Sequence, residues 1–233
     1  MTEFFEVHGI RVELLINSRR RSRIGISISP AGHVVLDAPP STDRVEATNL
    51  IHEHRRWLRH RLQKVQEDTL HIGKLGYKSG EVIRFLGESL ILEHHDSNQF
   101  VKSGRVLRAP FGNEASVRNG VKKWYREQAQ AVFTEVLEGL LYLPWLEKGM
   151  PSWRHSFMKS QWGSCSATGV ISLNTHLVRT PVRLIEYVAM HELCHLEHRN
   201  HSRRFYSLLS KYMQDWRVRS KDLGRNIPLL LDT

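Results

Sequence analysis

Two histidines one helical turn apart, with a glutamate between them, constrain this chain more than any other feature. They belong to the run His191-Glu192-Leu193-Cys194-His195. Residues four apart lie on the same face of a helix, so both imidazoles can reach one ion. Glu192 is rotated about 100° from His191, beside the ion, where a carboxylate can take a proton from water. The run therefore predicts a zinc-binding helix with Glu192 as the general base.

A third protein ligand must come from outside this helical turn, because a catalytic zinc keeps three protein ligands and one open position. We expect His201, since Asn200 tolerates the left-handed conformation that ends many helices and Ser202 can cap the next helix. Asp215 is the alternative ligand, because no glutamate follows residue 197. His198 is expected to face the substrate or to support a ligand. Chance spacing, with histidines that only cap or pack, is the alternative to a metal site.

The predicted zinc helix has a composition typical of a fully buried helix. Thr180 is the expected N-cap, and Pro181 follows in the first turn, where its missing backbone donor costs nothing. Apolar residues then lie on nearly every side of the helix. They are Val182, Leu184, Ile185, Tyr187, Val188, Ala189, Met190, Leu193, Cys194 and Leu196.

A pair of short strands is expected just before this helix. Arg154 to Met158 and Val170 to Leu173 have strand character, and the segment Gln161 to Ser166 between them contains a glycine. This pattern predicts a β-hairpin or paired strands. A sheet edge beside the helix can bind an extended peptide by strand addition. The alternative is that the strands only cover the helix.

These segments resemble the YgjP-like zinc metallopeptidases, which are similar to SprT-type and WLM-type proteins. The resemblance is carried by Lys159 to Ser166, Ile171 to Asn174, Ile185 to Val188, the run from His191 to His195, Asn200-His201-Ser202 and Phe205, and more loosely by Phe85-Leu86-Gly87. It implies a compact zincin-like domain, zinc bound by His191, His195 and His201, and a catalytic Glu192. Gln161 departs from the family pattern, which often has arginine there.

The arrangement of segments predicts an α+β protein with two parts. A β-rich domain with one helix is expected over residues 1–110, and a zincin-like metallopeptidase domain with the HExxH helix over 111–233, divided near Pro110 to Asn113. The strands expected in the first part are Val12–Ile16, Ile24–Ser29, Val34–Leu36, Val82–Leu86, Leu90–Leu92 and Val106–Leu107, with a turn at Pro30 to His33. Helices are expected from Ser41 or Thr42 to about Gln66, from Ala115 to Tyr142, and over Phe205 to Val218, where Met213 belongs to the packed face.

Composition adds a clue about partners. The net charge is +10 in 233 residues, with basic runs at Arg19 to Arg23 and Arg55 to Arg61. A basic field attracts polyanions, which makes nucleic acid a candidate partner, with Trp57 stacking on a base; the alternatives are a solvated basic face and a contact with an acidic protein. No apolar stretch is long enough to cross a bilayer, and no secretory leader is recognised. Cys165 and Cys194 are expected to be free thiols in a cytoplasmic protein, Cys194 as a core residue and Cys165 as a candidate inhibitory fourth ligand.

The sequence thus favours a zinc-dependent metallopeptidase in which zinc activates water and Glu192 is the general base. Its substrate is a protein or peptide, including proteins associated with nucleic acid. Two alternatives remain: a zinc hydrolase of a non-peptide bond, and a nucleic-acid-binding protein with a structural or inactive zinc site. Candidates for stabilising the oxyanion are Tyr187, His198, Arg203 and Tyr206. The oligomeric state is left open.

Overall fold

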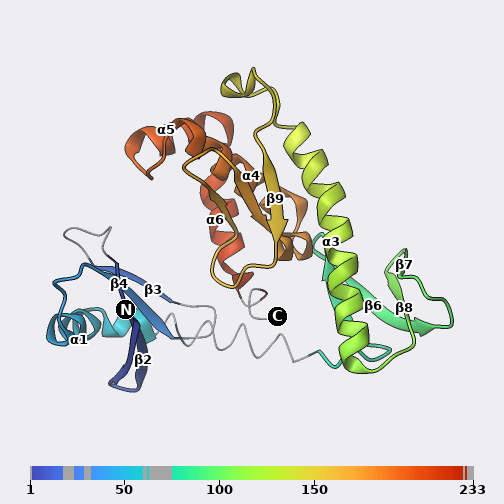
Figure 1. Cartoon of the computed structure of the whole chain (residues 1–233), viewed down its shortest axis with the longest axis horizontal. Coiled ribbons are helices and arrows are strands. Elements are labelled where there is room, and N and C mark those ends of the chain that lie inside the picture. The colour runs from blue at the N-terminus through green and yellow to red at the C-terminus, as the bar shows by residue number, and fades with distance from the viewer. Residues whose placement is uncertain are drawn as a thin grey trace. The chain divides into compact units, whose positions relative to one another are not determined.

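The protein is an α+β protein whose contacts divide it into two compact units, residues 1–73 and 74–233 (Figure 1). The computed structural model describes residues 2–17, 24–28, 33–59, 62, 75–227 and 229. The division differs from the boundary expected near residues 110–113. Strands in the range 82–110 belong to the second unit, because they share its hydrophobic core.

The first unit is a four-stranded sheet with a helix against it. Its strands, in the spatial order β1-β2-β4-β3, are β1 (Thr2–Val7), β2 (Ile10–Ile16), β3 (Gly25–Ile28) and β4 (Val34–Ala38), followed by helix α1 (Arg44–Glu53). Asp43 caps α1 by accepting from the backbone N–H of Glu46. Strand β1 was not predicted from the sequence. Helical residues continue over 55–59 after a turn at His54. Of the turn expected at Pro30 to His33, positions 30–32 lie outside the described residues, as do the Arg19–Arg23 run and positions 60 and 61.

The second unit begins with another four-stranded sheet, ordered β5-β6-β8-β7. Its strands are β5 (Val82–Phe85), β6 (Glu88–His95), β7 (Val101–Ser103) and β8 (Val106–Pro110). The β5–β6 turn has two residues with positive φ, Leu86 at 49° and Gly87 at 85°, as a type I′ hairpin turn requires. Leu86 N–H donates to the carbonyl of Val178 at 2.7 Å. A Cβ on Gly87 would lie 2.7 Å from Pro181 Cγ, so this turn is seated closely on the start of the next helix.

A long helix and a small sheet follow. Helix α3 (Glu114–Glu138) ends four residues before the expected Tyr142. The sheet has the order β10-β11-β9, with β9 (Trp153–Ser156), β10 (Gly163–Cys165) and β11 (Ile171–Asn174). β9 and β11 pair in parallel, so they are paired strands but not a hairpin, and β10 is an additional edge strand antiparallel to β11. The hairpin expectation was wrong because the segment between them itself pairs with β11.

Three helices complete the second unit: α4 (Val182–Glu197), α5 (Arg203–Tyr212) and α6 (Trp216–Gly224). The helix expected over Phe205 to Val218 is two helices, separated by residues 213–215. Met213 in this break is 8% exposed and belongs to the core as predicted. Thr180 is not the N-cap of α4. Pro181 occupies that position, and the Thr180 hydroxyl donates to the carbonyl of Leu177 in the preceding turn.

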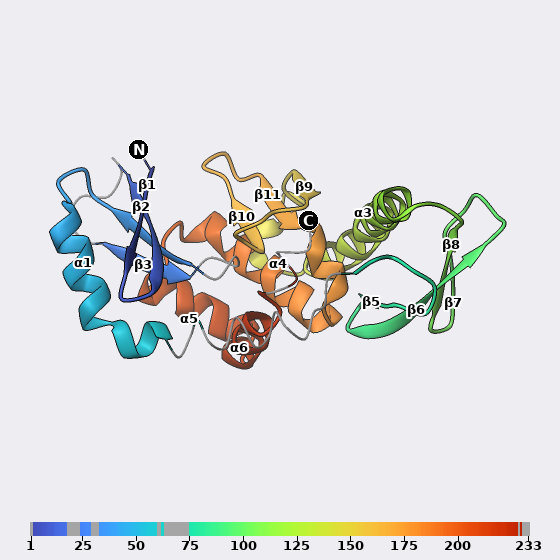
Figure 2. The same cartoon turned by 90° about the horizontal axis from the view of Figure 1, so that it is seen from below.

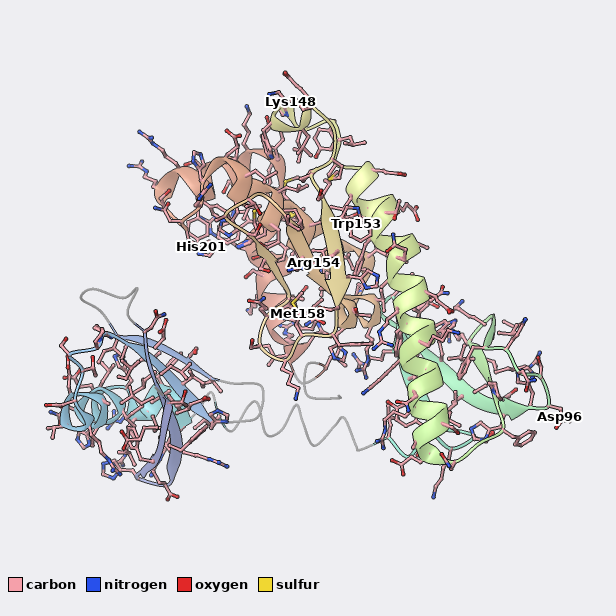
Figure 3. The ribbon with its side chains drawn as sticks, in the orientation of Figure 1. Asp96, Lys148, Trp153, Arg154, Met158 and His201 are labelled. Atoms are coloured by element: carbon pink, nitrogen blue, oxygen red, sulfur yellow. The ribbon has the colours of Figure 1, made fainter. Side chains whose placement is uncertain are left out.

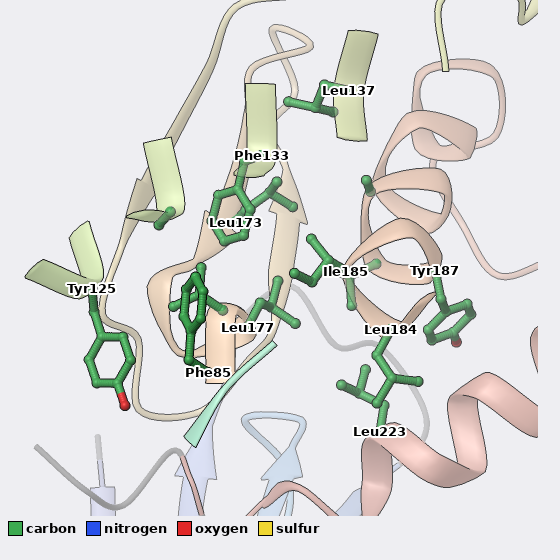
Figure 4. Packing of buried hydrophobic residues seen from close by; sticks show 14 of the residues in the cluster. Phe85, Tyr125, Phe133, Leu137, Leu173, Leu177, Leu184, Ile185, Tyr187 and Leu223 are labelled. Atoms are coloured by element: carbon green, nitrogen blue, oxygen red, sulfur yellow. The ribbon is translucent and has the colours of Figure 1, made fainter. Parts of the chain in front are cut away.

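The core of the second unit surrounds α4, as its composition predicted. Leu184, Ile185 and Leu193 are at most 1% exposed, and burying each such side chain contributes about 1.5–3 kcal/mol to folding. Figure 4 shows Ile185 near Leu177 from the preceding turn, and Leu184 beside Leu223 from α6. Figure 2 shows the β10–β11 strands lying beside α4, and contacts between these elements agree. Strands β10 and β11, the β5–β6 hairpin and helix α6 therefore fix the orientation of α4 together.

Among the described residues, no helix has the length and apolar character needed to cross a membrane.

Candidate metal centre

The three histidines singled out in the sequence lie together. His191 and His195 are on α4, and His201 is in the loop between α4 and α5, where Figure 3 labels it. One ring nitrogen from each lies within 4.8 Å of the other two, and the Nε2 atoms of His191 and His201 are 2.9 Å apart. Three imidazoles converging on one point form a donor set that suits zinc and other first-row transition metals.

His195 is oriented by a hydrogen bond from its other ring nitrogen. Its Nδ1 lies 3.0 Å from the backbone carbonyl of His198, which can only accept, so Nδ1 carries the proton. Nε2 is then left with its lone pair for a ligand. Such a bond commonly orients a metal-binding histidine. His198 thus contributes its backbone rather than its ring, as a group that supports a ligand.

The turn that carries His201 is built differently from the expectation. Asn200 does not adopt the left-handed backbone conformation. Among the described residues other than glycine, positive φ is found at His8, Tyr77 and Leu86. The chain leaves α4 at His198, whose φ of −133° and ψ of 97° are extended. Ser202 caps α5 as predicted, accepting from the backbone N–H of Phe205. Helix α4 therefore ends at an extended residue, His198, and not at the left-handed residue that was expected. Ser202, one residue after His201, caps the next helix.

Phe205 is a common wall for the three imidazoles. It is fully buried on α5, and its ring centroid lies 4.9, 4.6 and 4.9 Å from those of His191, His195 and His201. The Nδ1 atom of His191 is buried without a hydrogen-bond partner in the described part of the chain. The His191 ring is therefore oriented by packing against Phe205 and Tyr187, whereas the His195 ring is oriented by a hydrogen bond.

Burial favours the neutral form of two of these imidazoles, His191 and His201. Desolvation, followed by the neighbouring His195 and His201, lowers the pKa of His191 to about 3. Desolvation and then His195 also lower the pKa of His201. The neutral form is the one that offers a lone pair to a metal.

Glu192 lies beside the histidines and is 6% exposed. Burial raises the pKa of its carboxyl to about 7. Its neighbour is Gly163 on β10, where an added Cβ would lie 2.8 Å from Glu192 Oε1 and 2.9 Å from Val188 Cγ1. β10 can approach the carboxylate only because residue 163 has no side chain. From the sequence, Gly163 was expected in a connecting segment and had no predicted role.

A cavity of about 450 Å³ lies between β10 and these side chains. It is lined by His191, Glu192, His195, His201, Arg199 and residues 163–167. Arg199 was not among the candidates, although its place between two histidines in a short turn requires it to lie near them. The four suggested oxyanion stabilisers, Tyr187, His198, Arg203 and Tyr206, do not line this cavity. Their expected role has no support in the geometry.

Tyr187 and Tyr206 have other contacts. The pKa of Tyr187 is raised chiefly by burial, while a hydrogen bond to Ser220 opposes that change. The Tyr206 ring stacks against Trp216 with centroids 5.1 Å apart. Both tyrosines therefore support the helices around the histidines.

The alternative ligands do not join the histidine group. Asp215 forms an ion pair with Arg219 at 2.8 Å. The Cys165 thiol lines the cavity but lies outside the group of converging ligand atoms found in the described residues. Burial and then Glu192 raise its pKa, while Arg199 lowers it. Cys194 is fully buried, and desolvation raises its pKa to about 12, in keeping with a core residue.

A larger cavity, of about 800 Å³, lies on another face of α4. It is lined there by Val182, Glu186 and Met190, which follow one another at helical spacing, and it contains none of the three histidines. Size alone would favour this cavity, but the smaller one holds the groups capable of chemistry.

Comparison with known proteins gives one family and one solved structure. The family model described as YgjP-like, metallopeptidase domain, matches residues 22–226. The chain is also similar to the metallopeptidase zymogen of Methanocaldococcus jannaschii jannalysin, with 20% identity and a TM-score of 0.34. That similarity covers 42% of this chain and 95% of the other, and it is too weak to transfer architecture or chemistry. The comparison with curated proteins gives no match.

Proposed function

The chain belongs to the YgjP-like metallopeptidase family, and on this premise we propose that it hydrolyses peptide bonds with zinc, held by His191, His195 and His201. The observation that carries the proposal is the convergence of three imidazole nitrogens within 4.8 Å beside a buried carboxylate in one cavity. When bound, zinc supplies a Lewis acid that polarises the scissile carbonyl and lowers the pKa of water.

Glu192 is the general base in this proposal. Its carboxylate lines the same cavity as the histidines, so it can take a proton from the attacking water and return it to the leaving amine. Phe205, Val188 and Gly163 surround the ligands and the carboxylate closely, which limits their movement during the reaction. The role of each group follows from its position in the cavity.

Strand β10 is the proposed binding edge for an extended substrate. It pairs only with β11 in the described sheet, at one end of the order β10-β11-β9, and its residues 163–165 line the cavity. A polypeptide that adds to this edge gains backbone hydrogen bonds with little dependence on its sequence. A protein or peptide with an extended, accessible segment is therefore the expected substrate.

The direct test is proteolysis of an unfolded protein by the zinc-loaded protein, with a metal-free sample as control. Zinc-dependent appearance of new amino termini supports the proposal. A zinc hydrolase of a non-peptide bond would leave the protein substrate intact, although zinc binds.

Replacing Gly163 by alanine is expected to lower peptide hydrolysis by roughly 10²-fold. The new Cβ would lie under 3 Å from both Glu192 and Val188, so either the carboxylate or β10 must shift. Steady-state kinetics and the zinc content of the variant measure the effect; zinc binding should persist. Gly139→Ala is the matched control, because its added Cβ would meet atoms only at 3.4 Å and Gly139 does not line the histidine cavity. Full activity in Gly163→Ala would contradict the close contact.

We also propose that the first unit binds nucleic acid and thereby brings the enzyme to proteins associated with it. The observation in favour is Trp57, which is 51% exposed in a helical stretch that also exposes Arg56 and Arg59. An exposed indole can stack on a base while cations of the same stretch contact phosphates. Adding DNA to the proteolysis assay tests the link to activity.

Replacing Trp57 by alanine is expected to weaken binding of single-stranded DNA by about 1–3 kcal/mol, the contribution of one stacked base. Trp57→Phe should retain most of the affinity, because the aromatic face remains. Fluorescence anisotropy at two salt concentrations measures both effects, and binding should weaken with salt. Tyr142→Ala, which removes an aromatic ring that is 63% exposed in the second unit, is the control. Equal affinities for all variants would exclude a contact through Trp57.

A further inference from the structure

The wall of the histidine cavity lacks large apolar side chains. Apart from the histidines, Glu192 and Arg199, its lining consists of Gly163, Ser164, Cys165, Ser166 and Ala167. A leucine or phenylalanine of a substrate would find little apolar surface to cover it here. Small and polar substrate residues can therefore lie against this wall without leaving a large apolar side chain uncovered.

Arg199 supplies the only positive side-chain charge in this lining. Its Nη2 donates to the carbonyl of Ala167 at 3.0 Å, which ties the end of α4 to the turn that follows β10. Among the described residues, no carboxylate forms an ion pair with it. The remaining donors of its planar guanidinium can engage a carboxylate in bidentate geometry.

The other formal charge of the lining belongs to Glu192, which is 6% exposed and lies against Gly163. Arg199 is exposed at the cavity margin. The accessible charge next to the β10 edge is therefore positive. Because strand addition through backbone hydrogen bonds discriminates little between sequences, discrimination falls to the side chains that line the cavity.

We propose that Arg199 is a specificity residue that selects peptides with a glutamate or aspartate next to the scissile bond. This inference rests on the proposed peptidase function of the same site and adds the substrate class. The acidic side chain binds the guanidinium, and a lysine at the same place is repelled by it. The contact is formed equally in the bound substrate and during the reaction, so it lowers KM and leaves kcat nearly unchanged.

The experiment uses peptides of small residues in which one position at a time is Glu, Gln or Lys. At one position near the cleaved bond, kcat/KM should be about fivefold higher for Glu than for Gln, the effect of one partly exposed ion pair. Arg199→Glu should reverse the preference in favour of Lys. Arg199→Lys should retain the preference for Glu, and Arg199→Gln should abolish it. Arg204→Glu, an equal charge change at an exposed position of α5, should leave the preference unaltered.

A second readout separates this inference from the peptidase proposal. Fluorescence anisotropy measures the affinity of the same peptides for zinc-loaded Glu192→Gln protein, in which binding is observed without turnover. Equal affinities for Glu, Gln and Lys peptides at every position would overturn the role of Arg199, whether or not peptides are cleaved. Selective binding that depends on Arg199, without cleavage by the unaltered enzyme, would instead overturn the peptidase function and leave the acidic selectivity standing. Matched zinc content and thermal stability establish that each Arg199 variant is folded.

Discussion

Replacing Glu192 by glutamine is expected to lower peptide hydrolysis by roughly a factor of 10² to 10⁴ while zinc remains bound. The amide has nearly the shape of the carboxylate, so the cavity and the close contact with Gly163 are preserved. It cannot accept the proton of the attacking water. Single-turnover kinetics beside zinc analysis of the same sample measure the two quantities together.

Glu197→Gln is the matched control for this change. Glu197 lies at the end of the same helix and is exposed, outside the cavity lining. Its substitution should leave hydrolysis within a factor of about two, as is usual for surface changes. Retained hydrolysis in Glu192→Gln would assign the proton transfer to another group, and an unchanged nucleic-acid-linked activity would favour the non-enzymatic alternative.

Replacing His201 by alanine is expected to weaken zinc binding by more than about 100-fold, because changes to groups that only orient a ligand already cost about 10–100-fold. His191 and His195 would remain on α4, but two imidazoles leave the donor set incomplete. Zinc content after dialysis against a chelator measures the affinity. The increase in thermal stability on adding zinc should also disappear, since a ligand that binds the folded state stabilises it.

His198→Ala provides the control for the loss of an imidazole from the same turn. It keeps the backbone carbonyl that accepts from His195 Nδ1, so zinc binding should be nearly unchanged. If His198→Ala lost zinc and His201→Ala retained it, the assignment of the third ligand would be reversed.

Local spacing made much of the second unit predictable. The separation of His191 and His195 sets their common face from helix geometry alone. The apolar composition around them predicted a buried helix, and α4 is buried along most of its length. The position of Ser202 directly before an amphipathic segment predicted a cap that the structure contains. Each of these features depends on residues within about one or two turns of each other.

Features that depend on distant pairing were not predictable in the same way. The sequence between β9 and β11 contains a glycine and suggested a turn, yet Gly163 is in a strand because β11 offers a pairing edge. Nothing local indicates that β9 and β11 are parallel. The two-unit division likewise depends on Phe85 and Leu107 packing into the core around α3 and α4, which the sequence alone does not reveal.

The two ends of α4 are constrained unequally. At its beginning, Pro181 is wedged against Gly87, and the neighbouring turn is bonded to Leu86, so this end is anchored. The far end carries His195 and continues into an exposed turn. Arg199 of this turn donates a hydrogen bond to the carbonyl of Ala167 in the loop after β10. Because this turn also carries His201, the bond from Arg199 to Ala167 holds the third histidine in place relative to the loop after β10. The position of one histidine of the group therefore depends on a contact outside α4.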